Sequence, residues 1–423
     1  MPFRIALSGL NAASSDLKVT GNNIANASTN GFKSSRAEFA DVYANSLAGV
    51  SNTAIGGGVR LAGVAQQFAQ GNVEFTNNSL DLAISGEGFF VLNDGGSNVY
   101  TRAGAYSVDR DGYVVNSSSQ RLQVFSPIGT SGTAFNTGSL NDLRIQLTEG
   151  APNATSAVEL GLNLDASDAS AGAPAAFNAA DPTTFNYSTS YTVYDTLGAG
   201  HTATMYYLKD ATPGSNTWYS WLYADDGAGT MTNVPQGGNP YSSLEFSSSG
   251  ALTGVNGVPG ATSAASGPLT LATGAAPLAM TLDYTGMTQF GGDYSVNSLF
   301  QDGYATGRLT GLDVSDTGVV SARYTNGQSS ALGKIALASF PNTQGLRQLG
   351  DTNWAETYSS GDVLIGEAGT ASFGMLQSGA LEASNVDLSE QLINLITAQR
   401  NYQANSQVIS TADTITQTII NIR

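Results

Sequence analysis

The chain has 423 residues, no cysteine and a formal net charge of -17, and only 12% of its residues are charged. The missing cysteines exclude disulfides and thiolate sites. The acidic balance argues against nucleic acid or an anionic membrane surface as a partner. The 50 glycines, with abundant Ser, Thr and Asn, are typical of many short strands joined by tight turns. We therefore expect a mainly β protein of several domains.

The N-terminal segment predicts an amphipathic helix over residues 1–25. Small residues at Ser14 and Gly21 fill a seam of near-heptad spacing, and small seam residues permit close approach of a partner helix. The helix should end near Asn26, before the Asn30-Gly31 turn signal. The large apolar side chains of this seam are Phe3, Leu7, Leu10, Leu17 and Ile24.

The start of the chain lacks the features of a secretory signal peptide. Ser8, Gly9 and Asn11 interrupt its apolar residues, so no continuous apolar region forms. The longest uncharged stretch, residues 250–282, is rich in Gly, Pro and Ser and is only weakly apolar. We therefore expect no membrane insertion, and an export route other than a cleaved signal peptide if the protein is secreted.

The C-terminal segment predicts a second, longer helix. Asp387 is a suitable N-cap residue, and Glu390 follows at capping-box spacing. No Gly or Pro interrupts the segment after that point. Its apolar stripe consists of Leu388, Leu392, Leu395, Ile396, Tyr402, Ile409, Ala412, Ile415, Ile419 and Ile422.

The segment between the two helices predicts strands. Residues 34–75 read as a connector, and residues 107–108 and 114–115 flank an Asp-Gly turn typical of a β-hairpin. A faint repeat aligns Arg102, Val108, Gly112 and Val114 with Arg308, Val314, Gly318 and Val320. We therefore expect residues 76–146 and 304–381 to form one inner β domain. Residues 147–303 would be an outer, surface-exposed β domain inserted in it.

Each terminal helix has an apolar stripe that must be buried somewhere. The two helices could pack as a hairpin against their own β domain. Alternatively, residues 1–33 and 382–423 could form a coiled-coil-like module that packs again on the same module of neighbouring subunits. The heptad-like spacing favours helix-on-helix packing.

Several motifs occur in a fixed order along the chain: residues 8–33, 79–91, 100–109, 379–391 and 398–405. Together they closely resemble the signatures of the flagellar rod and hook protein family, and the resemblance covers more than half of the chain. Rod members are much shorter and lack a large middle insertion. Residues 193–201, 326–328 and 332–340 are similar to segments of hook members. The hook interpretation is therefore preferred, with a distal rod-type protein as the alternative.

The resemblance implies a structural role without catalysis or cofactor. Hook subunits polymerise into a curved helical tube outside the cell, a universal joint that passes torque from rod to filament. The implied partners are other copies of the chain, the distal rod protein, the hook cap protein, the hook–filament junction protein and the flagellar export apparatus. The implied polymerisation core is the set of large apolar residues named above for the two helices.

Two other classes of protein are weighed against this interpretation. A Ser-His-Asp enzyme would require the single histidine, His201, which lies in a Gly-rich turn and is expected at the surface, and no nucleophile elbow is present. Paired carboxylates for glycosidase chemistry are a second option, but nothing in the sequence points to a pair. Residues 109–112 lack the further ligands of a calcium loop, so we expect no metal site. A secreted β-rich adhesin would not need paired terminal heptads.

Overall fold

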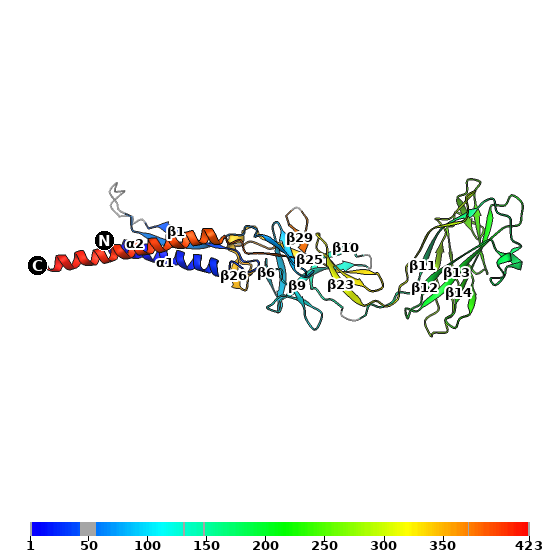
Figure 1. Cartoon of the computed structure of the whole chain (residues 1–423), viewed down its shortest axis with the longest axis horizontal. Helices are drawn as coiled ribbons and strands as arrows, with labels where there is room; N and C mark the ends of the chain where they lie inside the picture. The colour runs from blue at the N-terminus through cyan, green and yellow to red at the C-terminus, as the bar shows by residue number, and fades with distance from the viewer. Residues whose placement is uncertain (1, 43–55, 130–131, 147–148, 371, 422–423) are drawn as a thin grey trace. The chain divides into compact units, whose positions relative to one another are not determined.

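The computed structural model describes residues 2–42, 56–129, 132–146, 149–370 and 372–421. One long helix lies at each end of a strand-rich chain (Figure 1), α1 over Pro2–Ala25 and α2 over Leu388–Asn421. The chain forms two compact units. Unit 1 comprises Met1–Leu147, Thr310–Arg323 and Ser329–Arg423, and unit 2 comprises Thr148–Leu309 and Tyr324–Gln328. The predicted fold class is confirmed: terminal helices, and one β domain inserted in another.

Local signals set the ends of both helices. The side chain of Asp387 accepts hydrogen bonds from the backbone N–H groups of Ser389 (2.8 Å) and Glu390 (3.2 Å), which satisfies two donors that the first helical turn leaves free. At the other end, Asn26 follows the last residue of α1 and its side chain donates to the carbonyl of Asn22 (3.0 Å). The predicted N-cap and the predicted helix end are therefore both confirmed.

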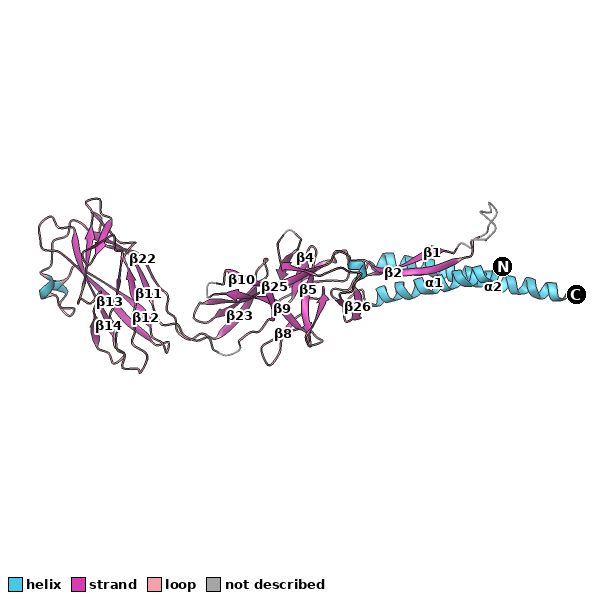
Figure 2. Ribbon diagram, turned by 180° about the vertical axis from the view of Figure 1, so that it is seen from behind, coloured by secondary structure: helices cyan, strands magenta, loops and turns pink. Residues whose placement is uncertain are grey.

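Part of the connector forms a two-stranded antiparallel sheet, β1 (Ser35–Asp41) with β2 (Val59–Gln66). Both strands contact α1, and the backbone N–H of Val59 donates to Oγ of Ser8 (3.2 Å). Figure 2 shows the sheet running alongside the helices. Connector residues 43–55 lie outside the described part of the chain.

Unit 1 is centred on a sheet whose main strand order is β23-β24-β25-β9-β5-β6-β27-β26. Three strands from before the insertion, β9, β5 and β6, therefore lie between strands from after it in one sheet. Besides β1 and β2, the bounds of the strands in this part of the chain are β3 (Val73–Phe75), β4 (Leu82–Ser85), β5 (Phe89–Asp94), β6 (Ser97–Thr101), β7 (Ser107–Val108), β8 (Val114–Val115), β9 (Arg121–Ile128), β10 (Ala134–Asp142), β23 (Leu309–Val314), β24 (Val319–Tyr324), β25 (Ser329–Ser339), β26 (Arg347–Gly350), β27 (Asn353–Ala355), β28 (Leu364–Glu367), β29 (Met375–Ser378) and β30 (Ala380–Glu382). A short 3-10 turn lies at Thr343–Gly345.

An aromatic cluster fills one side of this sheet. Phe89 contacts the rings of Trp354 (5.7 Å between centroids), Phe340 (6.0 Å) and Phe68 (5.6 Å). Phe68 comes from the connector, and its neighbour Gln66 accepts a hydrogen bond from Nε1 of Trp354 (2.6 Å). The connector is therefore anchored in the core of the β domain.

The faint sequence repeat corresponds to two turns of the same geometry. In the first, the N–H of Gly112 donates to Asp109 (3.1 Å); in the second, the N–H of Gly318 donates to Ser315 (2.9 Å). Both glycines have positive φ, 87° and 85°. The carbonyl of Gly112 accepts from Ile145 (2.7 Å) and that of Gly318 from Ile335 (2.8 Å). The repeat therefore marks two equivalent turns, each tied to a buried isoleucine.

Unit 2 contains two sheets with one shared core. Val158, Leu160 and Leu282 from the smaller sheet pack with Met205, Trp218 and Leu244 from the larger one. The smaller sheet consists of β11 (Ala157–Asp165), β19 (Ser263–Ala265), β20 (Thr281–Asp283), β21 (Thr288–Phe290) and β22 (Ser295–Gln301). The larger consists of β12 (Tyr187–Tyr194), β13 (Gly200–Lys209), β14 (Thr217–Asp225), β15 (Met231–Val234), β16 (Ser242–Phe246), β17 (Leu252–Val255) and β18 (Val258–Pro259).

Other parts of unit 2 complete it. The loop between β11 and β12 carries two 3-10 turns at Pro174–Ala176 and Pro182–Thr184, and Phe177 of this loop stacks on Trp221 (4.1 Å). The chain enters and leaves the unit side by side, because Gly150 bridges to Gly307 and Asn153 to Tyr304.

Gly104 provides a test of backbone packing in unit 1. A Cβ added there would lie 1.7 Å from the carbonyl oxygen of Leu82, whereas one added at Gly63 would meet nothing within 4 Å. We expect Gly104→Ala to lower the thermal stability of unit 1 by about 3 kcal/mol or more, with Gly63→Ala as the neutral control. Calorimetry checks both, and equal transitions for the two variants would contradict the packing described.

Candidate functional site: the terminal helix pair and its polar junction

The two terminal helices pack against each other in antiparallel orientation (Figures 1 and 2). Near the end of α1, Nδ2 of Asn23 donates to Oε1 of Gln391 (3.1 Å), close to the start of α2. Near the start of α1, Gly9 lies against Asn405, so closely that an added Cβ would be 2.4 Å from Oδ1. The helices therefore run side by side over most of the length of α1.

The buried face of α1 is built from small or polar side chains. Ala6, Ala13 and Thr20 are buried at intervals of seven residues, with Gly9 and Asp16 partly buried between them. On α2, Ala398 is fully buried. Together with the partly buried positions of this helix it follows the alternating spacing of four and three residues that is typical of a coiled coil. These positions are Gln391, Leu395, Asn405, Ile409 and Ala412.

The predicted core residues of α1 lie mostly one position beyond this seam. Phe3 and Leu7 are exposed, and Leu10, Leu17 and Ile24 are partly buried. Hydrophobic periodicity gives most weight to large apolar residues. The close contact between the helices instead uses Ala and Gly, whose small side chains let the two backbones approach. The heptad recurrence of Ala6, Ala13 and Thr20 is the sequence signal that could have identified the seam.

The predicted core residues of α2 fall into two groups. Leu395 and Ile409 are partly buried at seam positions, and Tyr402, at 38% exposure, continues the same spacing. The exposed group is Leu388, Leu392, Ile396 and Ile415. The side chains of Ile419 and Ile422 lie outside the described part of the structure.

A groove of about 700 Å³ on the helix pair is lined by Phe3, Ala404, Gln407, Val408, Thr411, Ala412, Asp413, Ile415 and Thr416.

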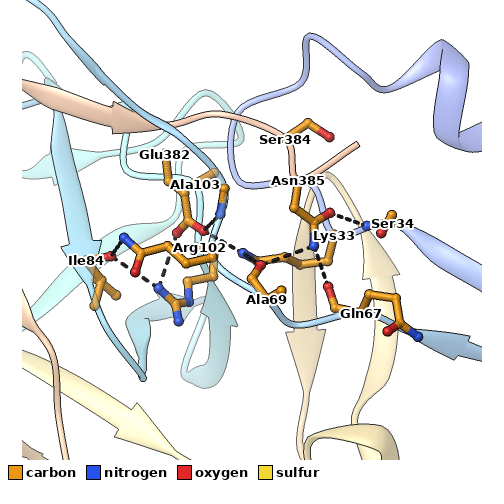
Figure 3. A network of polar contacts seen from close by, with 12 residues as sticks. Lys33, Ser34, Gln67, Ala69, Ile84, Arg102, Ala103, Glu382, Ser384 and Asn385 are labelled. Carbon is orange, nitrogen blue, oxygen red and sulfur yellow. Dashed lines mark hydrogen bonds and ion pairs between the residues drawn. The ribbon is translucent and has the colours of Figure 1, made fainter. Parts of the chain in front are cut away.

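A polar junction joins the helices to the β domain (Figure 3). Glu382 is fully buried there, with one carboxylate oxygen on Nζ of Lys33 (2.5 Å) and the other on Nη1 of Arg102 (3.2 Å). The side chains of Lys33 and Arg102 are 0% and 5% exposed. Two cations from distant parts of the chain therefore share one buried anion.

Backbone groups complete the junction. Nζ of Lys33 also donates to the carbonyl of Ala69 (2.8 Å), Arg102 donates to those of Gly86 (2.7 Å) and Ile84 (3.4 Å), and Gly71 N–H donates to Glu382 (2.9 Å). Asn385 accepts from the N–H of Ser34 (2.7 Å) and donates to the carbonyls of Gln67 (2.7 Å) and Ala69 (3.1 Å).

Burial dominates the electrostatics of the junction. It lowers the pKa of Lys33 and of Arg102, while the negative charge of Glu382 acts in the opposite direction on both. The positive charge of Arg102 further lowers the pKa of Lys33. The carboxylate is therefore what makes the burial of two neighbouring cations tolerable.

These three residues lie in motifs of the family resemblance but were not predicted to form a site. Lys33 ends the first motif, Arg102 lies in the Tyr100–Asp109 motif and Glu382 in the last but one. A charged residue inside each of three motifs, in a chain with so few charges, was the available signal.

His201 is not the surface residue expected from its turn. It is 2% exposed, and its Nε2 lies 3.2 Å from Oδ2 of Asp195, which also accepts from Thr273 (3.2 Å). The side chains from β13 and the preceding turn are thus part of the interior of unit 2. In the described ranges, no group of three His, Asp or Glu side chains could hold a metal ion. Neither helix there is long and apolar enough to cross a membrane.

Asp16 is a carboxylate at a seam position and makes no hydrogen bond or ion pair with any described residue. Burial raises its pKa above 3.8, so the ionised form disfavours the folded pair. We expect the stability of the helix pair to be greatest below that value and to fall as the pH rises through the folded pKa. Asp16→Asn should stabilise the pair at neutral pH and remove this dependence. Thermal unfolding followed by helical circular dichroism checks it; an unchanged pH profile would contradict it.

Glu382→Gln should destabilise unit 1, because it leaves Lys33 and Arg102 buried without an anion. The expected loss is about 3–5 kcal/mol. Glu367→Gln is the matched control: Glu367 pairs with Lys334 at 2.6 Å but is 27% exposed, so about 1 kcal/mol or less is expected. Calorimetry of both variants decides, and similar losses would contradict a special role for Glu382.

Four segments of the chain match models of known protein families, and two relatives align over its full length. Four family models match: flagella basal body rod protein (residues 3–33), flagellar hook protein FlgE/F/G D1 domain (83–158), flagellar basal body protein FlaE D2 domain (163–304) and flagellar basal body rod FlgEFG protein C-terminal (377–422). The flagellar hook protein FlgE of Escherichia coli K12 is 39% identical, and that of Salmonella typhimurium LT2 is 37% identical, each over 100% of both chains.

Other relatives give the same result. The flagellar hook protein FlgE of Borreliella burgdorferi is 35% identical over 99% of this chain and 98% of its own. The crystal structure of Helicobacter pylori flagellar hook protein FlgE2 shares the fold, with a TM-score of 0.54 and 16% identity over 73% of this chain and 100% of that chain. The chain therefore belongs to the flagellar hook protein FlgE family.

Proposed function

We propose that the chain is a structural subunit of the bacterial flagellar hook. It polymerises into a curved helical tube that passes torque from the rod to the filament. The observation that carries this proposal is the exposed apolar surface of the paired terminal helices. Leu392, Ile393 and Ile396 form one exposed patch on α2, and their exposed fractions are 50%, 64% and 50%. Contiguous exposed apolar side chains of this kind mark interaction surfaces.

The seam within the helix pair uses small side chains of α1 together with Leu395 and Ile409 of α2, whereas other large side chains, such as Leu392 and Ile396, remain exposed. Because Leu392 and Ile396 are already half buried, covering each of them with a neighbouring subunit would contribute about 1 kcal/mol. We assign the polymerisation core to the predicted set: Phe3, Leu7, Leu10, Leu17, Ile24, Leu388, Leu392, Leu395, Ile396, Tyr402, Ile409, Ile415, Ile419 and Ile422. In this assignment the two helices supply both the contact within a subunit and the contact between subunits.

The polar side chains of α2 suit a surface in a crowded assembly. Hydroxyls of Thr411, Thr414, Thr416 and Thr418 each donate to the carbonyl four residues earlier, at 2.8–2.9 Å. These hydroxyls need no partner from another subunit, so close packing does not leave them unsatisfied. Neutral groups of this kind also avoid the desolvation cost of buried charge.

The proposal extends to organisation, location and partners. Residues 1–33 and 382–423 form the assembly module, 34–75 the connector, 76–146 with 304–381 the inner domain and 147–303 the outer domain. The subunit functions outside the cell at the outer end of the basal body, exported without a cleaved signal peptide. Its partners are other copies of itself, the distal rod protein, the hook cap protein, the hook–filament junction protein and the export apparatus. No catalysis and no cofactor are proposed.

Polymerisation tests the proposal. Leu392→Asn with Ile396→Asn changes exposed residues outside the seam, so each subunit should keep its helix pair but form no tubes. Deleting residues 388–423 should leave the β domains folded and abolish tubes altogether. The matched control is Gln403→Ala, an exposed polar position on the same helix, which should polymerise like the parent. Electron microscopy and sedimentation of concentrated protein provide the readout, and normal tubes from the double variant would contradict the proposal.

A further inference from the structure

We propose that Glu382 fixes the register of the C-terminal segment. Its ion pairs with Lys33 and Arg102 select the one alignment in which β30 can dock beside β3. That alignment in turn sets which face of α2 meets α1. The proposal concerns a single subunit and holds whether or not the chain polymerises.

The strand pair alone specifies its alignment weakly. β3 and β30 have three residues each, with Val73 opposite Glu382, Glu74 opposite Leu381 and Phe75 opposite Ala380. A shift of two residues keeps every side chain on its original face of the sheet. Hydrophobic patterning therefore cannot distinguish the observed alignment from its neighbours two residues away.

The junction distinguishes them by charge. A shift of two residues in either direction would place Ala380 or Ser384 where Glu382 now lies, and both side chains are neutral. Lys33 and Arg102 would then be buried with carbonyl acceptors only, at Ala69, Ile84 and Gly86. Glu87 acts on Arg102 from an exposed position, and among the described residues the ion pair of Lys33 is with Glu382. Fixing alignment is the best-supported use of a buried ionic group, since such groups add little net stability.

The alignment is transmitted to the helices over a short distance. Leu388 begins α2 six residues after Glu382, and Asn385 is held on the way by Ser34, Gln67 and Ala69. A shift of two residues would turn an α-helix by about 200°. The residues now facing α1, such as Gln391 and Ala398, would then face away from it.

Cross-linking tests the alignment directly, because the chain has no cysteine of its own. Glu74→Cys with Leu381→Cys reports the observed alignment, since these residues are cross-strand partners. Glu74→Cys with Ala383→Cys reports a shift of two residues. In the full-length chain, oxidation should yield a disulfide only in the first pair. Adding Glu382→Gln should raise the yield of the second pair about tenfold or more. Adding Glu367→Gln, the matched control at another ion pair, should leave both yields unchanged.

A second variant separates alignment from stability. Lys33→Met with Arg102→Met and Glu382→Met removes all three charges and leaves no buried ion. We expect this variant to stay folded and to give both disulfides, because no buried charge then distinguishes the observed alignment from the shifted one. The proposal is overturned if this variant, or Glu382→Gln, yields only the native disulfide. Loss of both disulfides in Glu382→Gln, with the native one alone restored in the triple variant, also overturns it, because Glu382 would then act through stability.

Discussion

A buried charge must be balanced where it is buried, and in this chain one carboxylate balances two cations. Lys33, Arg102 and Glu382 lie far apart in the sequence, so their meeting point closes the chain on itself. At the same place the backbone N–H of Gly71 donates to Glu382, and the side chain of Asn385 donates to the carbonyl of Gln67. The connector, the inner sheet and both helices are thereby tied to one point. The helix pair, which lacks a large apolar interface of its own, depends on this point for its position.

The helix pair combines two kinds of packing surface. Inside it, Ala13 and Ala398 allow close approach, so the contact is tight but buries little apolar area. Outside it, Leu392 and Ile396 remain half exposed. A module of this design is marginal by itself and gains stability when its outer surface is covered. In the proposed assembly, contacts between subunits would supply this stability, while the junction fixes the position of the helices within each subunit.

The sequence predicted the elements better than their contacts. Capping at Asp387 and the turn after Asn26 are local signals, so both helix ends could be read directly. The equivalent turns at Gly112 and Gly318 could also be recognised from the sequence, because both positions have a positive φ, which favours glycine. The seam was missed because hydrophobic periodicity ranks Leu10 above Ala13. The junction was missed because the motifs show that Lys33 and Glu382 are unusual charges but not that they meet, which follows only from three-dimensional proximity. His201 was misplaced for the same reason, since Asp195 and Thr273 meet it only in the folded unit.

The way the chain enters and leaves unit 2 has an evolutionary consequence. Gly150 bridges to Gly307 and Asn153 to Tyr304, so the two ends of the inserted segment are neighbours. An insert whose ends are adjacent can be lengthened, shortened or exchanged without moving the strands that flank it. The inner sheet, the junction and the helices could then stay constant while the outer unit diverges. Unit 2 is in this sense a cassette, which can change in length and sequence while the helix pair and its junction stay the same.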